Sequence, residues 1–333
     1  MQPMNDLDAL DASPAHLDTF TFSGARQGVK LVVLGAVHGN ETCGTQAIHR
    51  LIGELKAGAV CIIQGSLTLV PIANPRAYAR GQRHADRNLN RSMKYREIPR
   101  NYEDHVANVL CPLLAQNDVL LDLHSFQGEG RPFVMLGPRD NQESVEAFAR
   151  AGEEEWLAMH LGPSRIVEGW MTAYTTGVSK RFAATNSDAE IGEQMSNGIG
   201  TTEFMRAAGG YGVTLECGPH SEPNAPAVAY RAIRQTLALL GLEAEAPEPP
   251  CANFELLRLV EVVDRHDPAD AFTQVWASYD AVVASQAIGV RSTGEIVRAP
   301  RDGYVVFPNE KAPRGSEWFY FAEASRRPLT SRR

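Results

Sequence analysis

Along most of the chain, continuously apolar stretches alternate with amphipathic ones. The run from Lys30 to Val37 is almost entirely apolar, which is typical of a strand covered on both faces in a parallel or mixed sheet. A helix is predicted next, because Asn40 or Thr42 can cap a segment with apolar residues at helical spacing. The other predicted elements are strands at Val60–Ile63, Leu67–Ile72, Val119–Leu123 and Gly212–Glu216, and helices near Tyr102–Gln116, Gln142–Trp156 and Ala225–Leu240. We therefore expect an α/β three-layer sandwich with a central mixed β-sheet.

The pattern changes after Leu242. Residues Glu243–Pro250 are acidic and rich in proline, as in a linker. Short strands separated by Gly, Pro and Asp turns are predicted beyond it, at Phe254–Val263, Ala281–Val283, Glu295–Arg298, Gly303–Phe307 and Glu317–Ala322. We expect an α/β domain over residues 1–244 and a small C-terminal β domain over residues 251–333.

Charge and composition exclude several classes of protein. The 40 acidic and 32 basic residues give a net charge of −8, which argues against a nucleic-acid partner. No apolar run approaches the ~20 residues that span a bilayer, so no membrane association is expected. The stretch from Met1 to Phe20 is acidic and lacks the basic start of a signal peptide, which predicts a cytoplasmic protein. The five cysteines are scattered and are interpreted as reduced thiols, and a homo-oligomer is compatible with the sequence.

Two histidines and a glutamate follow the ends of predicted strands. His38 and Glu41 lie three residues apart in GAVHGNETCG, and His124 ends the apolar run DVLLDLHSF. Ligands of α/β sheets bind at the carboxyl ends of strands, so these side chains are expected to converge. A catalytic zinc site commonly has two His and one carboxylate with one open position. The sequence therefore predicts one Zn²⁺ per chain, although each residue alone is compatible with a structural role.

Two further carboxylates belong to the same strand ends. Asp122 lies two residues before His124, on the same strand face, and suits an acceptor that orients a ligand histidine. Glu216 closes an apolar strand, where a charge is costly unless it is paired or has a chemical role, and near a zinc-bound water it would be the general base. A nucleophilic role for Ser125 or Cys217 is disfavoured, because neither residue has a suitably spaced His and acid that the metal site does not already use.

A long polar loop from Asn74 to Arg100 contains seven arginines. A solvated loop is the ordinary interpretation of such a stretch, but loops of this length often carry function. Arginines beside a zinc site would hold an anionic substrate and the oxyanion formed on a carbonyl.

The chain contains four motifs in order: the H-x-x-E turn, the loop with N-L-N-R, then D-L-H-S and E-C-G. As a set they resemble those of the succinylglutamate desuccinylase and aspartoacylase family, relatives of the zinc carboxypeptidases. The resemblance covers about Lys30–Leu240. It implies that His38, Glu41 and His124 bind zinc and that Glu216 activates water.

The same resemblance assigns the substrate contacts. Arg83 matches the arginine that polarises the scissile carbonyl, and Asn90 with Arg91 matches the pair that binds the α-carboxylate. Arg206 matches an arginine that binds the side-chain carboxylate of the substrate in aspartoacylase. Asn88 departs from the family pattern, which has Asp at this point of the motif, and so does Thr202, which replaces a Tyr.

These residues predict a zinc-dependent amidohydrolase that cleaves a small anionic N-acyl amino acid to a carboxylate and a free amino acid. The family resemblance also implies that residues 1–244 form the catalytic domain, and that the C-terminal β domain covers the active-site cleft and excludes a peptide chain from it. A metallocarboxypeptidase acting on peptide C-termini is the main alternative. A metal-retaining binding protein without turnover is the other, although such a protein has no use for a base at Glu216.

Overall fold

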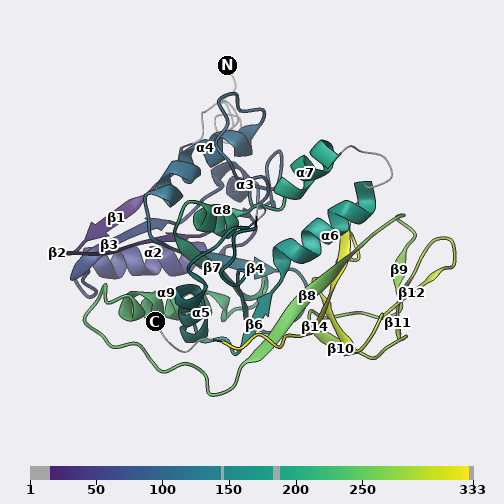
Figure 1. The fold of residues 1–333 in the computed structure, drawn as a ribbon. Helices are drawn as coiled ribbons and strands as arrows, with labels where there is room; N and C mark the ends of the chain where they lie inside the picture. Colours follow the sequence, from purple (N-terminus) through teal and green to yellow (C-terminus); the bar gives the residue numbers. More distant parts are fainter. Residues whose placement is uncertain (1–15, 144–145, 183–187, 330–333) are drawn as a thin grey trace.

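The fold is built on one large mixed sheet. The computed structural model describes residues 16–143, 146–182 and 188–329. Within these residues an 11-stranded sheet has the order β1-β3-β2-β4-β7-β5-β6-β8-β14-β13-β10 (Figure 1). In this order its strands are Phe20–Ser23, Gln64–Val70, Arg26–Leu34, Val119–Phe126, Tyr211–Pro219, Phe133–Met135, Arg165–Glu168, Glu255–Asp264, Glu317–Ala324, Gly303–Val306 and Asp280–Val282. A three-stranded antiparallel sheet lies beside it, with β9 at Ala271–Phe272, β11 at Ala287–Val290 and β12 at Ile296–Arg298.

Helices cover both faces of the large sheet. They are α2 (Cys43–Lys56), α3 (Pro75–Ala79), α4 (Tyr102–Ala115), α5 (Ala151–His160), α6 (Trp170–Phe182), α7 (Asp188–Ser196), α8 (Thr201–Ala207) and α9 (Ala225–Leu239). In Figure 1, α4 and α8 lie above the sheet, and α5 and α9 lie below it. The predicted α/β fold with a central mixed sheet and an additional small β layer is confirmed.

The uninterrupted apolar run of β2 follows from this layering. Leu31 and Val33 face the core beneath α2 and α9, whereas Val32 and Leu34 face the core beneath α4. All four are fully buried. Because successive side chains point to opposite faces, a strand between two helical layers needs apolar residues at every position.

Several predicted elements have other bounds. The apolar run predicted as a strand at Lys30–Val37 belongs to β2, which ends at Leu34. Ala36 adopts a left-handed φ of 48° and turns the chain away from the sheet. The predicted strand Val60–Ile63 is wrong: it is a connection between α2 and β3 in which only Val60 is buried. The predicted helix Gln142–Trp156 begins later, at Ala151. The strands β1, β5, β6, β9 and β11 and the helices α3, α6, α7 and α8 were not predicted.

The C-terminal strands extend the central sheet. β8 pairs in parallel with β6, and β14 pairs antiparallel with β8. The acidic connection from Glu243 to Pro250 lies between α9 and β8 and contains no helix or strand. The large sheet includes strands from both sides of this connection. The division into residues 1–244 and 251–333 therefore stays a prediction.

Helices in the described part of the chain are too short or too polar to cross a membrane. The five cysteines are free thiols. Residues 1–15, which carry most of the acidic N-terminal stretch used above, lie outside the described residues.

Candidate active site

Three neighbouring parallel strands bring the predicted metal ligands to one edge of the sheet. The turn after β2 carries His38 and Glu41, whose backbone N–H donates to the His38 carbonyl at 3.1 Å. His124 lies near the end of β4 and is paired in register with Glu216 of β7. Since the strands are parallel, their carboxyl ends meet at one edge, as the sequence predicts.

A glycine lets this turn approach the arginine-rich loop. A Cβ on Gly39 would stand 2.1 Å from the carbonyl carbon of Ala77 in α3, so the backbones pack too closely for any side chain. The Gly39 N–H donates to the Arg83 carbonyl at 3.3 Å. The turn that carries the ligands is thus attached to the loop that carries Arg83.

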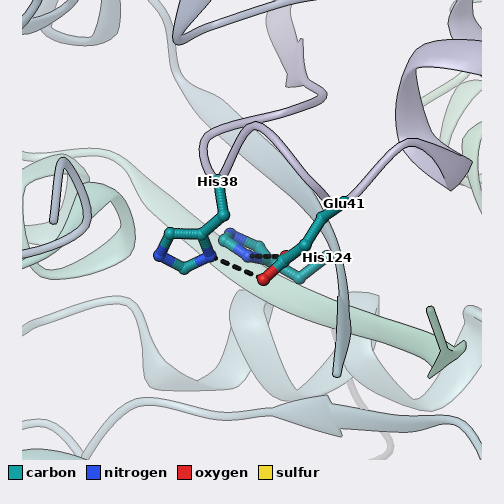
Figure 2. A group of neighbouring side chains, drawn as sticks. All are labelled: His38, Glu41 and His124. Atoms are coloured by element: carbon teal, nitrogen blue, oxygen red, sulfur yellow. Dashed lines mark hydrogen bonds and ion pairs between the residues drawn. The ribbon is translucent and has the colours of Figure 1, made fainter. Parts of the chain in front are cut away.

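The ligand atoms converge on one point. His38 Nδ1 lies 2.8 Å from Glu41 Oε1, and His124 Nδ1 lies 2.8 Å from Glu41 Oε2 (Figure 2). One ligand atom from each residue lies within 4.8 Å of the others, and all three residues are at most 3% exposed. Two imidazole nitrogens and one carboxylate form a donor set suited to zinc, whereas Mg²⁺ and Ca²⁺ prefer oxygen alone.

The tautomer of His38 is set by Asn88. Asn88 Oδ1 accepts the backbone N–H of Asn90 at 2.9 Å, which identifies this atom as the oxygen. The same oxygen lies 2.9 Å from His38 Nε2, which must therefore carry a proton and donate it. His38 Nδ1 is thus left with its lone pair directed at the metal position. Asn88 therefore acts as the acceptor that fixes the tautomer of a metal-binding histidine. The asparagine that departs from the family motif fulfils this role without a charge.

Asp122 lies behind His124, as predicted. Its Oδ2 is 2.9 Å from His124 Nε2, but the two atoms lack the alignment of a hydrogen bond. The Thr201 hydroxyl at the start of α8 donates to the same oxygen. Asp122 is fully buried, so this fixed charge acts on His124 without solvent screening.

The charges around the two histidines shift their pKa values in opposite directions. Burial lowers the pKa of His38 from 6.5 to about 4, and the positive charge of Arg83 adds to this. Burial would also lower the pKa of His124, but the charges of Asp122 and Glu41 outweigh it and raise that pKa well above 6.5. Burial opposes ionisation of Glu41, yet the two histidines hold the pKa of Glu41 well below 4.5. These shifts favour a neutral His38, a protonated His124 and an ionised Glu41 in the metal-free protein.

Metal binding should therefore release protons. At pH 7 we expect about one to two protons per ion, because a ligand His124 must be deprotonated and a nearby cation also lowers the pKa of Glu216. Affinity for Zn²⁺ should rise with pH between 6 and 8. Titration calorimetry in two buffers of different ionisation enthalpy measures the release. A heat that is independent of the buffer would contradict this charge assignment.

Glu216 faces the cluster from β7. It is the one partly exposed residue in an otherwise buried strand, and its Oε2 has no hydrogen-bond partner among the described residues. Burial raises the pKa of Glu216 from 4.5 to about 8; His124 and Arg83 oppose this rise, whereas Glu41 and Asp122 add to it. A buried carboxylate oxygen without a partner fits a site that binds a cation and a water molecule.

A cavity of about 1770 Å³ lies over this edge of the sheet. All predicted site residues except Asp122 line it, and so do the C-terminal residues Phe307, Pro308 and Tyr320. Pockets for small ligands usually measure about 300–1,000 Å³. The volume therefore gives no support to the expectation that the cleft excludes peptides by size.

Arg83 occupies the cavity wall beside the ligands. Its Nη1 donates to Glu41 Oε1 at 3.0 Å, and its side chain is 47% exposed. Because this is the one side-chain bond that the Arg83 guanidinium makes among the described residues, it retains donors for a substrate carbonyl.

Asn90 and Arg91 lie on the same wall. Asn90 Oδ1 accepts the Thr201 backbone N–H at 2.9 Å, and Arg91 Nη1 donates to the Asn90 carbonyl at 2.8 Å. The Arg91 guanidinium stacks on Trp170 of α6, with Cζ 4.4 Å from the ring centroid, and lies 5.9 Å from that of Tyr174. These rings hold the cation in one orientation at the cavity wall. These rings were not identified from the sequence, because α6 was not predicted.

Arg206 is in a different environment from the one expected. Its Nε and Nη2 donate to the two oxygens of Glu154 at 2.8 and 2.9 Å, and Nη2 also donates to the Gly212 carbonyl at 3.1 Å. Its Nη1 donates to Glu146 at 2.8 Å and to Glu203 at 3.3 Å. These five bonds use all the guanidinium donors, and the side chain is 3% exposed. Arg206 therefore has no free donor for the predicted contact with a substrate carboxylate.

A further polar group at the cavity went unrecognised in the sequence. Ser125 Oγ lies 2.8 Å from His220 Nδ1, and His220 Nε2 lies 3.4 Å from Asn40 Nδ2. Ser125 thus has a histidine partner outside the metal site that the sequence did not reveal. The only signal was the histidine of E-C-G-P-H, four residues after Glu216. No carboxylate completes this group among the contacts of the described residues.

The chain is similar to known proteins in sequence and in fold. A model of the succinylglutamate desuccinylase/aspartoacylase catalytic domain family matches residues 27–240. A probable aspartoacylase from Prochlorococcus marinus subsp. pastoris is 33% identical over 116 residues, which are 33% of this chain and 38% of that protein. The chain thus matches less than half the length of this relative.

Solved structures share the fold over nearly the whole chain. A succinylglutamate desuccinylase/aspartoacylase from Rhodobacter sphaeroides superposes with a TM-score of 0.68 at 18% identity, covering 93% of this chain and 90% of that one. The product-bound ectoine utilization protein from Ruegeria pomeroyi gives 0.65 at 19% identity, with 92% and 88% covered. At this identity the likeness shows the fold.

Proposed function

Because the chain belongs to the succinylglutamate desuccinylase/aspartoacylase family, we propose that it uses zinc to hydrolyse the amide bond of an N-acyl amino acid. The products are a carboxylate and a free amino acid. The observation that carries the proposal is the convergence of His38 Nδ1, His124 Nδ1 and the Glu41 carboxylate beside the unpartnered oxygen of Glu216. A small anionic substrate suits the cations of the cavity wall.

The ligands fit a zinc ion. Held by His38, Glu41 and His124, the ion would supply a water molecule of lowered pKa and a positive charge for the substrate carbonyl. Asn88 keeps the lone pair of His38 Nδ1 directed at the ion.

The protein groups perform the remaining steps. Arg91, held by Trp170, binds the α-carboxylate together with Asn90. Glu216 takes a proton from water as the oxygen attacks the amide carbon, and Arg83 donates to the carbonyl oxygen as it becomes negative. Glu216 then delivers the proton to the leaving nitrogen, and the C–N bond breaks.

Zinc content tests the ligand set. Protein purified without chelator should contain one zinc per chain, and His124→Ala should lose it, because two ligands do not complete the site. Elemental analysis measures the content. His49→Ala is the matched control, since His49 is exposed on α2 and outside the cavity. Full hydrolase activity in metal-free protein would contradict the assignment.

A substrate panel tests the reaction. Zinc-loaded protein is incubated with N-acetyl and N-succinyl amino acids and with a tripeptide, and amine release is measured. We expect hydrolysis of acyl amino acids that disappears on chelation. Preference for the tripeptide would favour a carboxypeptidase, for which the cavity has room. Absence of any hydrolysis would favour a metal-binding protein without turnover.

A further inference from the structure

Arg206 and its partners bear on substrate choice. Three carboxylates, those of Glu146, Glu154 and Glu203, surround this one guanidinium. Glu154 is fully buried and also accepts the backbone N–H groups of Gly137 and Gly212, at 2.7 and 3.1 Å. The protein's own carboxylates and the Gly212 carbonyl thus occupy every donor to which a substrate carboxylate would bind.

Glu203 lies on the side of Arg206 that faces the active site. Both belong to α8, whose first residue, Thr201, contacts Asn90 and Asp122. Arg206 lies in the last turn of this helix and contacts Gly212, near the start of β7. Glu203 is one turn closer to Asn90, and its Oε2 accepts the N–H of Gly200 at 2.9 Å. A substrate group that extends from Asn90 toward Arg206 meets the carboxylate of Glu203 first.

The other wall of the cavity near Glu216 is apolar. Met135 pairs in register with Thr214, two residues before Glu216 on the same strand face, and Phe126 and Phe307 also line the cavity. The Phe126 and Phe307 rings pack with their centroids 6.5 Å apart. Phe307 adopts a left-handed φ of 52° with its N–H bonded to Ser278 Oγ, so its position at the cavity is held at a backbone cost.

We propose that Glu203 is a specificity-determining residue that rejects a second carboxylate, so that the enzyme acts on N-acyl amino acids whose side chains are not acidic. This inference rests on the proposed function and narrows its substrate class. Arg206 then has a structural role, and the α-carboxylate that contacts Asn90 and Arg91 is the anionic group that the site reads. Like charges at a few ångströms in a partly dehydrated pocket repel strongly, which is a repulsive element of specificity.

The experiment compares substrates whose side chains differ in charge. The kcat/KM of the zinc-loaded enzyme is measured for N-acetyl-glutamate, N-acetyl-glutamine and N-acetyl-ornithine, in wild type and in Glu203→Gln. Glu143→Gln is the matched control, because Glu143 is an exposed carboxylate that lines the same cavity and is not among the Arg206 partners. Glu203→Asp, which keeps the charge, is the second variant, and thermal unfolding confirms that each variant is folded.

In wild type we expect the glutamine substrate to exceed the glutamate substrate by about tenfold or more, and the ornithine substrate to be at least as good. Glu203→Gln should reduce the discrimination against glutamate by roughly tenfold, whereas Glu143→Gln and Glu203→Asp should retain it. A wild type that prefers N-acetyl-glutamate overturns the inference and leaves the proposed function intact. Unchanged discrimination in folded Glu203→Gln also overturns it. Absence of hydrolysis of every acyl amino acid overturns the proposed function as well.

Discussion

Replacing Glu216 by glutamine should lower kcat by roughly 10²–10⁴, because general-base catalysis contributes about that factor. The change keeps the shape of the side chain but removes its ability to accept a proton. Its zinc content should stay at one ion per chain, since Glu216 is not among the converging ligands. Steady-state kinetics on the best acyl amino acid, together with elemental analysis, measures both quantities.

The control for Glu216→Gln is again Glu143→Gln, which changes a carboxylate of the same cavity that is remote from the ligands in sequence and exposed. Loss of zinc from the Glu216 variant would identify this residue as a ligand. An unchanged kcat would remove it from the reaction and would restore the hypothesis of a protein that only binds a metal.

Replacing Arg206 by alanine should lower the free energy of unfolding by about 3–5 kcal/mol, because breaking a buried ion pair leaves a charge without compensation. The deficit falls on Glu154, Glu146 and Glu203. Burial already raises the pKa of Glu146 from 4.5 to about 8 in the presence of Arg206. Loss of the guanidinium removes the charge that opposes this rise, so the pKa of Glu146 rises further and the loss of stability should be larger at pH 8 than at pH 5. Urea unfolding at both pH values measures it.

Arg139→Ala serves as the control for Arg206→Ala, since Arg139 lines the same cavity and is exposed. Its unfolding free energy should change by less than about 0.5 kcal/mol. If Arg206→Ala instead unfolds like wild type and loses activity on acidic substrates alone, Arg206 contacts the substrate, as the family resemblance implies.

The layered fold and the metal ligands were predictable because their signals are local. The apolar run of β2 requires two covered faces, and a polar residue that ends such a run lies at the carboxyl edge of the sheet. His38, Glu41, His124 and Glu216 all follow this rule. Neighbouring parallel strands bring their ends together whatever the intervening segments do, so the separation of 83 positions from Glu41 to His124 did not obscure the site.

The partners of the site residues depended on contacts between distant segments. Asn88 lies 50 residues from His38, and Glu154 lies 52 residues from Arg206. Both pairings involve segments whose path the apolar pattern does not specify: the arginine-rich loop, α5 and the short helix α8.

By itself, the sequence determined which residues end the buried strands, and through them the fold class and the cluster of His38, Glu41 and His124. The tertiary structure alone decided what each arginine binds. Arg91 stacks on Trp170 and stays at the cavity wall, whereas Arg206 is enclosed by three carboxylates. The physical reason is that apolar periodicity is written along one segment, whereas the charge environment of a side chain is the sum over all segments that pack around it.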